Sequence, residues 1–221
     1  MTVVDHTGPM LLPDTAYDMW ARGELDDFVH APESSRVEVI GGSVVVSPPP
    51  ALEHNAVVGD ISYALAQARA GREGFPWRAD QGTGLSLVGI GEGFSPDLVV
   101  LDRDVYLAAR RSRVKTLVPD QVELVVAVTS SSTAENDRRP AKSTRKQPES
   151  SKWNRYAVAE IPYYLLVDRS PKIMKSTLYS IPDRGSAAYL HEESWPFGDT
   201  DRLPDPFDLD IDTSEWTPWQ D

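Results

Sequence analysis

Three long apolar runs constrain the fold of this chain more than any other feature of its sequence. They lie within residues 95–102, 122–128 and 161–168, and their apolar side chains follow one another with almost no polar alternation. Such runs are typical of strands that are buried on both faces of a sheet. Between the second and third runs lie a polar stretch and a short amphipathic segment at 152–159, which predict a right-handed helical crossover between parallel strands. We therefore expect an α+β fold with a central mixed β-sheet flanked by helices.

Shorter patterns add a hairpin on either side of this core. Residues 36–46 form two β-rich runs joined by Gly41 and Gly42, which predicts an N-terminal hairpin. Runs at 176–181 and 187–191, joined by turn residues at 182–185, predict a C-terminal edge hairpin. Helices are expected at 54–69, where apolar residues recur every three or four positions, and at 15–23, where Asp14 is the expected N-cap.

Length and composition favour one folded domain. Of the 221 residues, we assign 31–195 to the domain, 1–30 to an N-terminal extension and 196–221 to an acidic tail that packs on the domain through tryptophans. The chain contains no cysteine, which excludes a disulfide frame, a thiolate nucleophile and cysteine-ligated zinc, and favours a cytoplasmic location. No apolar run approaches the ~20 residues needed to cross a bilayer, so no membrane partner is expected.

The charge of the chain is unevenly distributed. A formal net charge of −12 argues against a general-purpose nucleic-acid binder, because release of counterions from phosphates requires a basic surface. Residues 138–155 nevertheless carry seven basic side chains and one acid, or +6, whereas residues 199–221 carry eight acids and one arginine, or −7. The basic segment predicts either a local surface for nucleic acid or a solvated loop, and the acidic segment is typical of a solvated tail.

Five short motifs follow one another in a characteristic order along the chain. They are Glu38 with Gly41 and Gly42, followed by Pro48 and His54; residues 95–100 around Asp97; residues 123–130; residues 132–138; and Lys152 with Tyr156 and residues 161–168. In this order the chain resembles the Uma-two family of restriction-endonuclease-like proteins, a branch of the PD-(D/E)xK nuclease superfamily. The resemblance spans about residues 36–168 and implies a restriction-endonuclease-like core. It also implies Mg²⁺-dependent (or Mn²⁺-dependent) hydrolysis of phosphodiester bonds in DNA, and a homodimer.

The resemblance assigns roles to three side chains. It implies that Asp97 is the metal-binding aspartate, that Glu38 is an additional acid at the metal, and that Lys152 on the following helix is the catalytic lysine. Carboxylates suit this role because Mg²⁺ prefers near-octahedral oxygen ligands. A metal-bound water acquires a lower pKa, and a nearby ammonium stabilises negative charge on the phosphate. Each acid also has a simpler interpretation, because Asp97 can end a turn and Glu38 can be a charge on an edge strand.

The chain departs from the family pattern at Ala127, where the family has a glutamate. Alanine offers no side-chain oxygen, so we expect binding of Mg²⁺ to be weakened and cleavage to be impaired. Glu123 is four residues earlier on the same strand face, or ~13 Å away at the rise of a β-strand, which is too far to replace the missing ligand. Glu135 or Asp137 on the adjoining segment is the alternative source of a second carboxylate.

A second departure is the segment 141–151, which reads as an inserted mobile loop between the 137–138 element and the lysine helix. Lys142 and Lys146 within it are the alternatives to Lys152 as the catalytic lysine. Four side chains are candidates for contacts with nucleic acid: His54, Arg138, Lys142 and Lys146. A helix cap is the alternative role for His54, and exposure to solvent is the alternative for the loop.

Three functions are therefore compatible with the sequence. The chain is a metal-dependent DNA endonuclease with an impaired site, or a binding or regulatory module that has kept the fold without hydrolysis, or an enzyme of this fold recruited to a different reaction. The residue at position 127 separates the three, because it decides whether a second acid is available.

Overall fold

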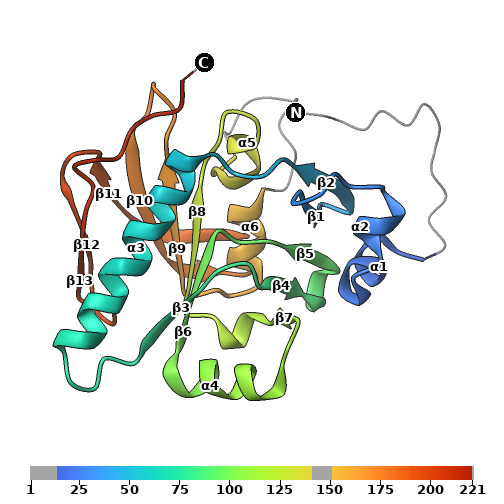
Figure 1. Cartoon of the computed structure of the whole chain (residues 1–221), viewed down its shortest axis with the longest axis horizontal. Coiled ribbons are helices and arrows are strands. Elements are labelled where there is room, and N and C mark those ends of the chain that lie inside the picture. The colour runs from blue at the N-terminus through green and yellow to red at the C-terminus, as the bar shows by residue number, and fades with distance from the viewer. Residues whose placement is uncertain (1–13, 141–150, 221) are drawn as a thin grey trace.

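The computed structural model describes residues 14–140 and 151–220, and its centre is a mixed six-stranded sheet (Figure 1). The strands occur in the order β11 (Ala188–Pro196), β10 (Lys175–Asp183), β9 (Tyr163–Asp168), β8 (Leu124–Val128), β6 (Leu98–Asp102) and β3 (Trp77–Asp80). Strands β8 and β9 are parallel, and every other pair in this sheet is antiparallel. The three apolar runs thus form the central strands, and the expected α+β class is confirmed.

Side chains of the central strands alternate between two cores, which explains why the runs are apolar throughout. In β6, Val99 and Leu101 enter one core while Leu98 and Val100 enter the other. In β8, Val125 and Ala127 lie on the first side and Val126 on the second. A strand covered on both faces has no solvent-facing position for a polar residue.

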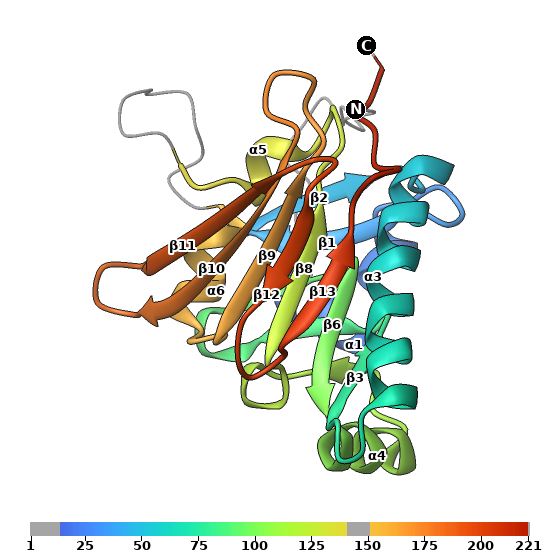
Figure 2. The ribbon, with the colours of Figure 1, turned by 90° about the vertical axis from the view of Figure 1, so that its left-hand side faces the viewer.

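One face of the sheet is covered by a long helix and by the C-terminal segment. Helix α3 (Leu52–Gly71) crosses this face beside the hairpin of β12 (Thr200–Leu203) and β13 (Leu209–Asp212), as Figure 2 shows. Phe207, which is fully buried, packs against the rings of Trp77 and Tyr163. The acidic tail thus contributes to the hydrophobic core as well as to the surface.

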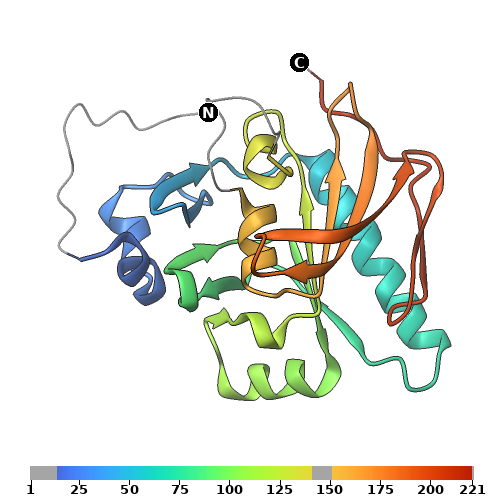
Figure 3. The same ribbon diagram turned by 180° about the vertical axis from the view of Figure 1, so that it is seen from behind.

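The opposite face is covered by the crossover helix and a second sheet. Helix α6 (Lys152–Val158) packs near β10 and β11 (Figure 3), and α5 (Ala134–Asp137) precedes it. The second sheet has the order β2 (Ser43–Ser47), β1 (Arg36–Ile40), β5 (Glu92–Phe94), β4 (Gly84–Leu87) and β7 (Thr116–Leu117). The parallel β8–α6–β9 unit and both predicted hairpins are confirmed.

Three details differ from the expectations. The N-terminal helices are α1 (Ala16–Arg22) and α2 (Leu25–Phe28), and the N-cap of α1 is Thr15, whose hydroxyl accepts the Asp18 N–H. The prediction of Asp14 as the cap was wrong by one residue; its carboxylate instead accepts the Thr15 N–H and pairs with Arg22. The sequence analysis also missed α4 (Arg103–Ser112), a largely exposed helix whose core-facing stripe is short.

Helix α1 is held against the second sheet by a close approach at Gly93. The Trp20 indole donates its N–H to the Val37 carbonyl at 2.9 Å and lies directly over Gly93. A Cβ atom at residue 93 would come within 2.2 Å of the Trp20 ring. The glycine is therefore required by packing and not by backbone conformation.

Candidate functional site

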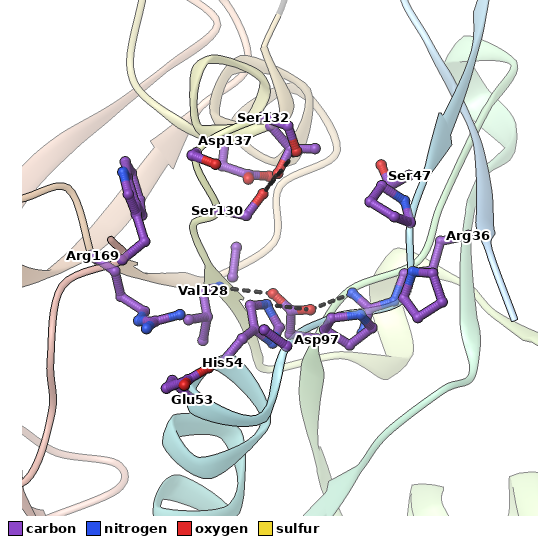
Figure 4. Close-up of a pocket in the computed structure, with 18 of the residues that line it drawn as sticks. Arg36, Ser47, Glu53, His54, Asp97, Val128, Ser130, Ser132, Asp137 and Arg169 are labelled. Carbon is purple, nitrogen blue, oxygen red and sulfur yellow. Dashed lines mark hydrogen bonds and ion pairs between the residues drawn. The ribbon is translucent and has the colours of Figure 1, made fainter. Parts of the chain in front are cut away.

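A cavity of about 600 Å³ opens at the end of the central sheet, between the first turn of α3, the β1–β2 hairpin and the α5 segment. Figure 4 shows Asp97 near its centre, with His54, Arg36 and Val128 around it. The structure brings all four residues that the sequence assigned to the catalytic centre into its lining: Glu38, Asp97, Ala127 and Lys152. It also places His54 and Asp137 there.

Asp97 is the most tightly held carboxylate of the cavity. Its Oδ2 accepts the backbone N–H of Val128 at 2.7 Å, and its Oδ1 lies 3.3 Å from Nε2 of His54 and contacts the guanidinium of Arg36. Burial alone would raise the pKa of Asp97, but the hydrogen bond and charge of His54, together with Arg36, hold it at about 2. Asp97 is therefore ionised throughout the physiological range.

The register of the neighbouring strands β6 and β8 sets Ala127 beside Asp97. The antiparallel register pairs Leu98 with Val126, and continuing it by one residue sets position 97 opposite position 127. Directly opposed residues on one face of a sheet have Cβ atoms roughly 4.5–5.5 Å apart. Because Ala127 lines the cavity, a longer acidic side chain at this position would extend into the cavity beside Asp97.

Lys152 makes a second charged cluster with two buried carboxylates. It begins helix α6, and its Nζ lies 2.9 Å from Oε1 of Glu38 and 3.4 Å from Oδ1 of Asp137. The same Glu38 oxygen accepts the backbone N–H of Ser95 at 2.7 Å, so Glu38 ties the second sheet to the loop that carries Asp97. The side chain of Lys152 is 11% exposed and those of its partners are 5% and 6% exposed, so all three groups depend on one another for charge compensation.

The carboxyl of Asp137, which lies beside Lys152, differs in pKa from that of Asp97. Burial is the main cause that raises the pKa of Asp137 to about 6, and the charges of Glu38 and Asp97 add to it, while Lys152 opposes it. Burial opposes the charged form of Lys152 too, but Glu38 and Asp137 outweigh that effect and raise the pKa of the ammonium. The cavity thus contains a strongly acidic carboxyl, a permanent cation and a carboxyl that titrates near neutral pH.

The residues present do not fit a metal ion in this arrangement. In residues 14–140 and 151–220, no three His, Cys, Asp or Glu side chains are placed so that they could hold one. Asp97 is engaged on both oxygens by internal donors, Glu38 is paired with Lys152, and Ala127 supplies no ligand. The described residues alone therefore do not present the set of oxygen ligands that Mg²⁺ requires.

The four residues predicted to contact nucleic acid do not all lie in the cavity. His54 lies in the cavity and contacts Asp97. Its alternative role as a helix cap was wrong, because the N-cap of α3 is Ala51 and no side chain caps the start of this helix. Arg138 lies outside the cavity lining and pairs with Asp168 at 2.7 Å and with Glu135 at 2.6 Å. Lys142 and Lys146 lie outside the described residues.

Sequence reasoning missed two arginines of the cavity, although each had a detectable signal. Arg36 is two residues before Glu38 on β1, and alternate residues of a strand share a face. Arg169 directly follows β9, whose carboxyl end lies beside that of its parallel neighbour β8. Both arginines line the cavity.

Comparisons with known proteins identify the family and the fold of the chain. The chain matches the model of the Uma2 family, described as "Putative restriction endonuclease", over residues 25–213, and it belongs to that family. A solved structure, a putative nuclease belonging to DUF820 from Anabaena variabilis ATCC 29413, superposes with a TM-score of 0.58 at 14% identity, covering 86% of this chain and 95% of the other. This likeness shows that the fold is shared.

No curated protein matches the chain. Among the described helices, none is long and apolar enough to span a bilayer.

Proposed function

We propose that this chain is a nuclease-fold protein that binds DNA at the Asp97 cavity and in which metal-dependent phosphodiester hydrolysis is impaired. The observation that carries the proposal is that Asp97, Ala127 and Lys152 line one cavity, where the register of β6 and β8, continued by one residue, sets position 97 beside position 127. A carboxylate at 127 would complete a pair of acids beside the lysine, which is the arrangement that phosphodiester hydrolysis by a hard cation needs. Alanine removes one of the two, so metal binding is expected to be weak.

The internal contacts of Asp97 support a binding role for the chain as it stands. Arg36 neutralises the carboxylate of Asp97 and His54 contacts it, and Lys152 neutralises Glu38. A cavity whose acids are compensated by cations repels a phosphate group less than a cavity of free carboxylates would. This favours the second candidate, a non-hydrolytic DNA-binding or regulatory module, over an enzyme recruited to a different reaction.

Restoring the acid separates the two candidates. Plasmid nicking with Mg²⁺ or Mn²⁺ should be slow or absent for the parent chain, should rise by orders of magnitude for Ala127→Glu, and should disappear again for Ala127→Glu combined with Asp97→Asn. The matched control is Ala127→Gln, which has nearly the same shape but no charge. Calorimetry should show that Ala127→Glu binds the metal more tightly than both the parent and the control.

The possible outcomes are distinct. A parent chain that nicks DNA as fast as Ala127→Glu would show that the site is not impaired. A folded Ala127→Glu protein that binds DNA and still does not cut would favour the non-hydrolytic module. Absence of DNA binding in every variant would contradict the proposal as a whole.

A further inference from the structure

Within the part of the chain that the structure describes, Arg169 is a buried cation of the cavity without an acidic partner. The residue is 4% exposed, and among the residues that the structure describes, its guanidinium makes one hydrogen bond, from Nε to the Thr217 carbonyl at 3.0 Å, and no ion pair. A guanidinium has five N–H donors, so the four on its terminal nitrogens are left for another acceptor. A buried charge without compensation is costly, and such charges are normally paired.

The environment of Arg169 explains why the charge is uncompensated. Burial lowers the pKa of its guanidinium, and Glu53 is the acid whose charge opposes that effect. Glu53 also lines the cavity and is mostly exposed to solvent, and it makes no ion pair with Arg169 among the described residues. Water therefore screens this carboxylate, and it compensates the arginine only weakly.

A second feature of the same wall also favours an anion. Helix α3 begins at Leu52 after Ala51, no side chain caps its first turn, and residues 51, 53 and 54 line the cavity. The first N–H groups of a helix lack intrahelical acceptors and carry partial positive charge, so a 20-residue helix such as α3 offers an anion-binding end. Arg169 and the start of α3 thus contribute donors to one cavity.

Arg169 is separated from the other arginine of the cavity. Figure 4 shows Arg36 and Arg169 on opposite sides of His54 and Asp97. Arg36 already contacts Asp97, whereas Arg169 has no acidic partner in residues 14–140 and 151–220. A strand of nucleic acid that crosses the cavity would therefore meet an uncompensated cation on the Arg169 side.

We infer that Arg169 and the N-terminal turn of α3 form an anion site that binds a phosphate group, and that it holds a second phosphate of a DNA strand beside the Asp97 centre. The DNA part of this inference rests on the proposed function, whereas the phosphate site itself does not. Arg169 also anchors the C-terminal segment, because the backbone N–H of Trp219 donates to the backbone carbonyl of Arg169 at 3.1 Å. The test must therefore separate binding of phosphate from anchoring of the tail.

Three variants make that separation. Arg169→Gln removes the charge, and Arg169→Lys keeps it as a second, more conservative change. A chain that ends at Thr217 loses Trp219 but keeps the guanidinium. The matched control is Arg72→Gln, because Arg72 also donates to tail carbonyls, those of Phe207 and Asp208, and does not line the cavity.

The first measurement uses inorganic phosphate, at constant ionic strength, as a ligand that raises the melting temperature of the parent chain. We expect Arg169→Gln to weaken the apparent affinity for phosphate roughly tenfold or more, since hydrogen bonds to charged groups are worth that much. Arg169→Lys, the shortened chain and Arg72→Gln should stay within about threefold of the parent by the same reasoning. A parent chain that phosphate does not stabilise, an unchanged affinity in Arg169→Gln, or an equal loss in the shortened chain would overturn the inference.

The second measurement uses a short DNA duplex without metal. Arg169→Gln should weaken binding and reduce the slope of log K against log salt by about 0.9, the value for one phosphate contact. If the parent binds phosphate through Arg169 but does not bind DNA, the site stands and the proposed function fails. If DNA binds equally well to the parent and to Arg169→Gln, the second-phosphate role fails while the proposed function remains.

Discussion

Removing the charge of Lys152 tests the electrostatic account of the cavity most directly. Lys152→Met keeps a side chain of similar length but leaves Glu38 and Asp137 as buried carboxylates without their shared cation. Removal of one partner from a buried pair costs about 3–5 kcal/mol, because the remaining charge is uncompensated. We expect a loss of that size in the free energy of unfolding at pH 8.

The loss should be smaller in acid. Lys152 lowers the pKa of Asp137, and in its presence that pKa is about 6. Without the lysine the pKa rises further, so at pH 5 Asp137 is protonated and no longer needs a cation. The cost of the substitution should therefore fall by about 1–2 kcal/mol between pH 8 and pH 5.

Urea unfolding followed by tryptophan fluorescence measures both quantities, since Trp153 neighbours Lys152 on α6. Lys172→Met, at an exposed lysine, is the control and should change stability by less than about 0.5 kcal/mol. A cost of less than about 1 kcal/mol for Lys152→Met at pH 8, or an equal cost at both pH values, would refute the reasoning.

Three further predictions use other parts of the structure. The pKa of Asp137 is higher in the folded than in the unfolded state, so the stability that its protonated form contributes is lost as pH rises from about 4 through 6. Asp137→Asn should remove this fall in the free energy of unfolding, which is up to about 3 kcal/mol. Urea titrations across this pH range measure it. Gly93→Ala forces the Trp20 ring aside and should lower stability by about 1–3 kcal/mol, whereas Gly89→Ala, with open space around it, is the control in a thermal melt. Phe207→Ala empties a fully buried position between two aromatic rings and should cost about 3–5 kcal/mol; an unchanged melting temperature would show that the tail is not part of the core.

The central sheet could be predicted from the sequence because it depends on local patterns, and the candidate site residues could be named because their order resembles that of a known family. Continuous apolar runs indicate strands that are covered on both faces, and the segment at 152–159 predicted the helical crossover between two of them. The order of Glu38, Asp97 and Lys152 along the chain then indicated the family, and the structure brings these three side chains into one cavity. The absence of an acid at Ala127 was also evident from the sequence alone.

What each charged side chain contacts was decided by the tertiary structure alone. The partners are distant in sequence: Asp97 meets Arg36 and Val128, and Glu38 meets Lys152. No local pattern encodes such contacts, because they depend on how two sheets and a helix pack together. The same packing buries Arg169 beside the first turn of α3 and covers it with the tail. Since burial fixes the energy of every charge, only the folded chain determines which of the described cations have acidic partners.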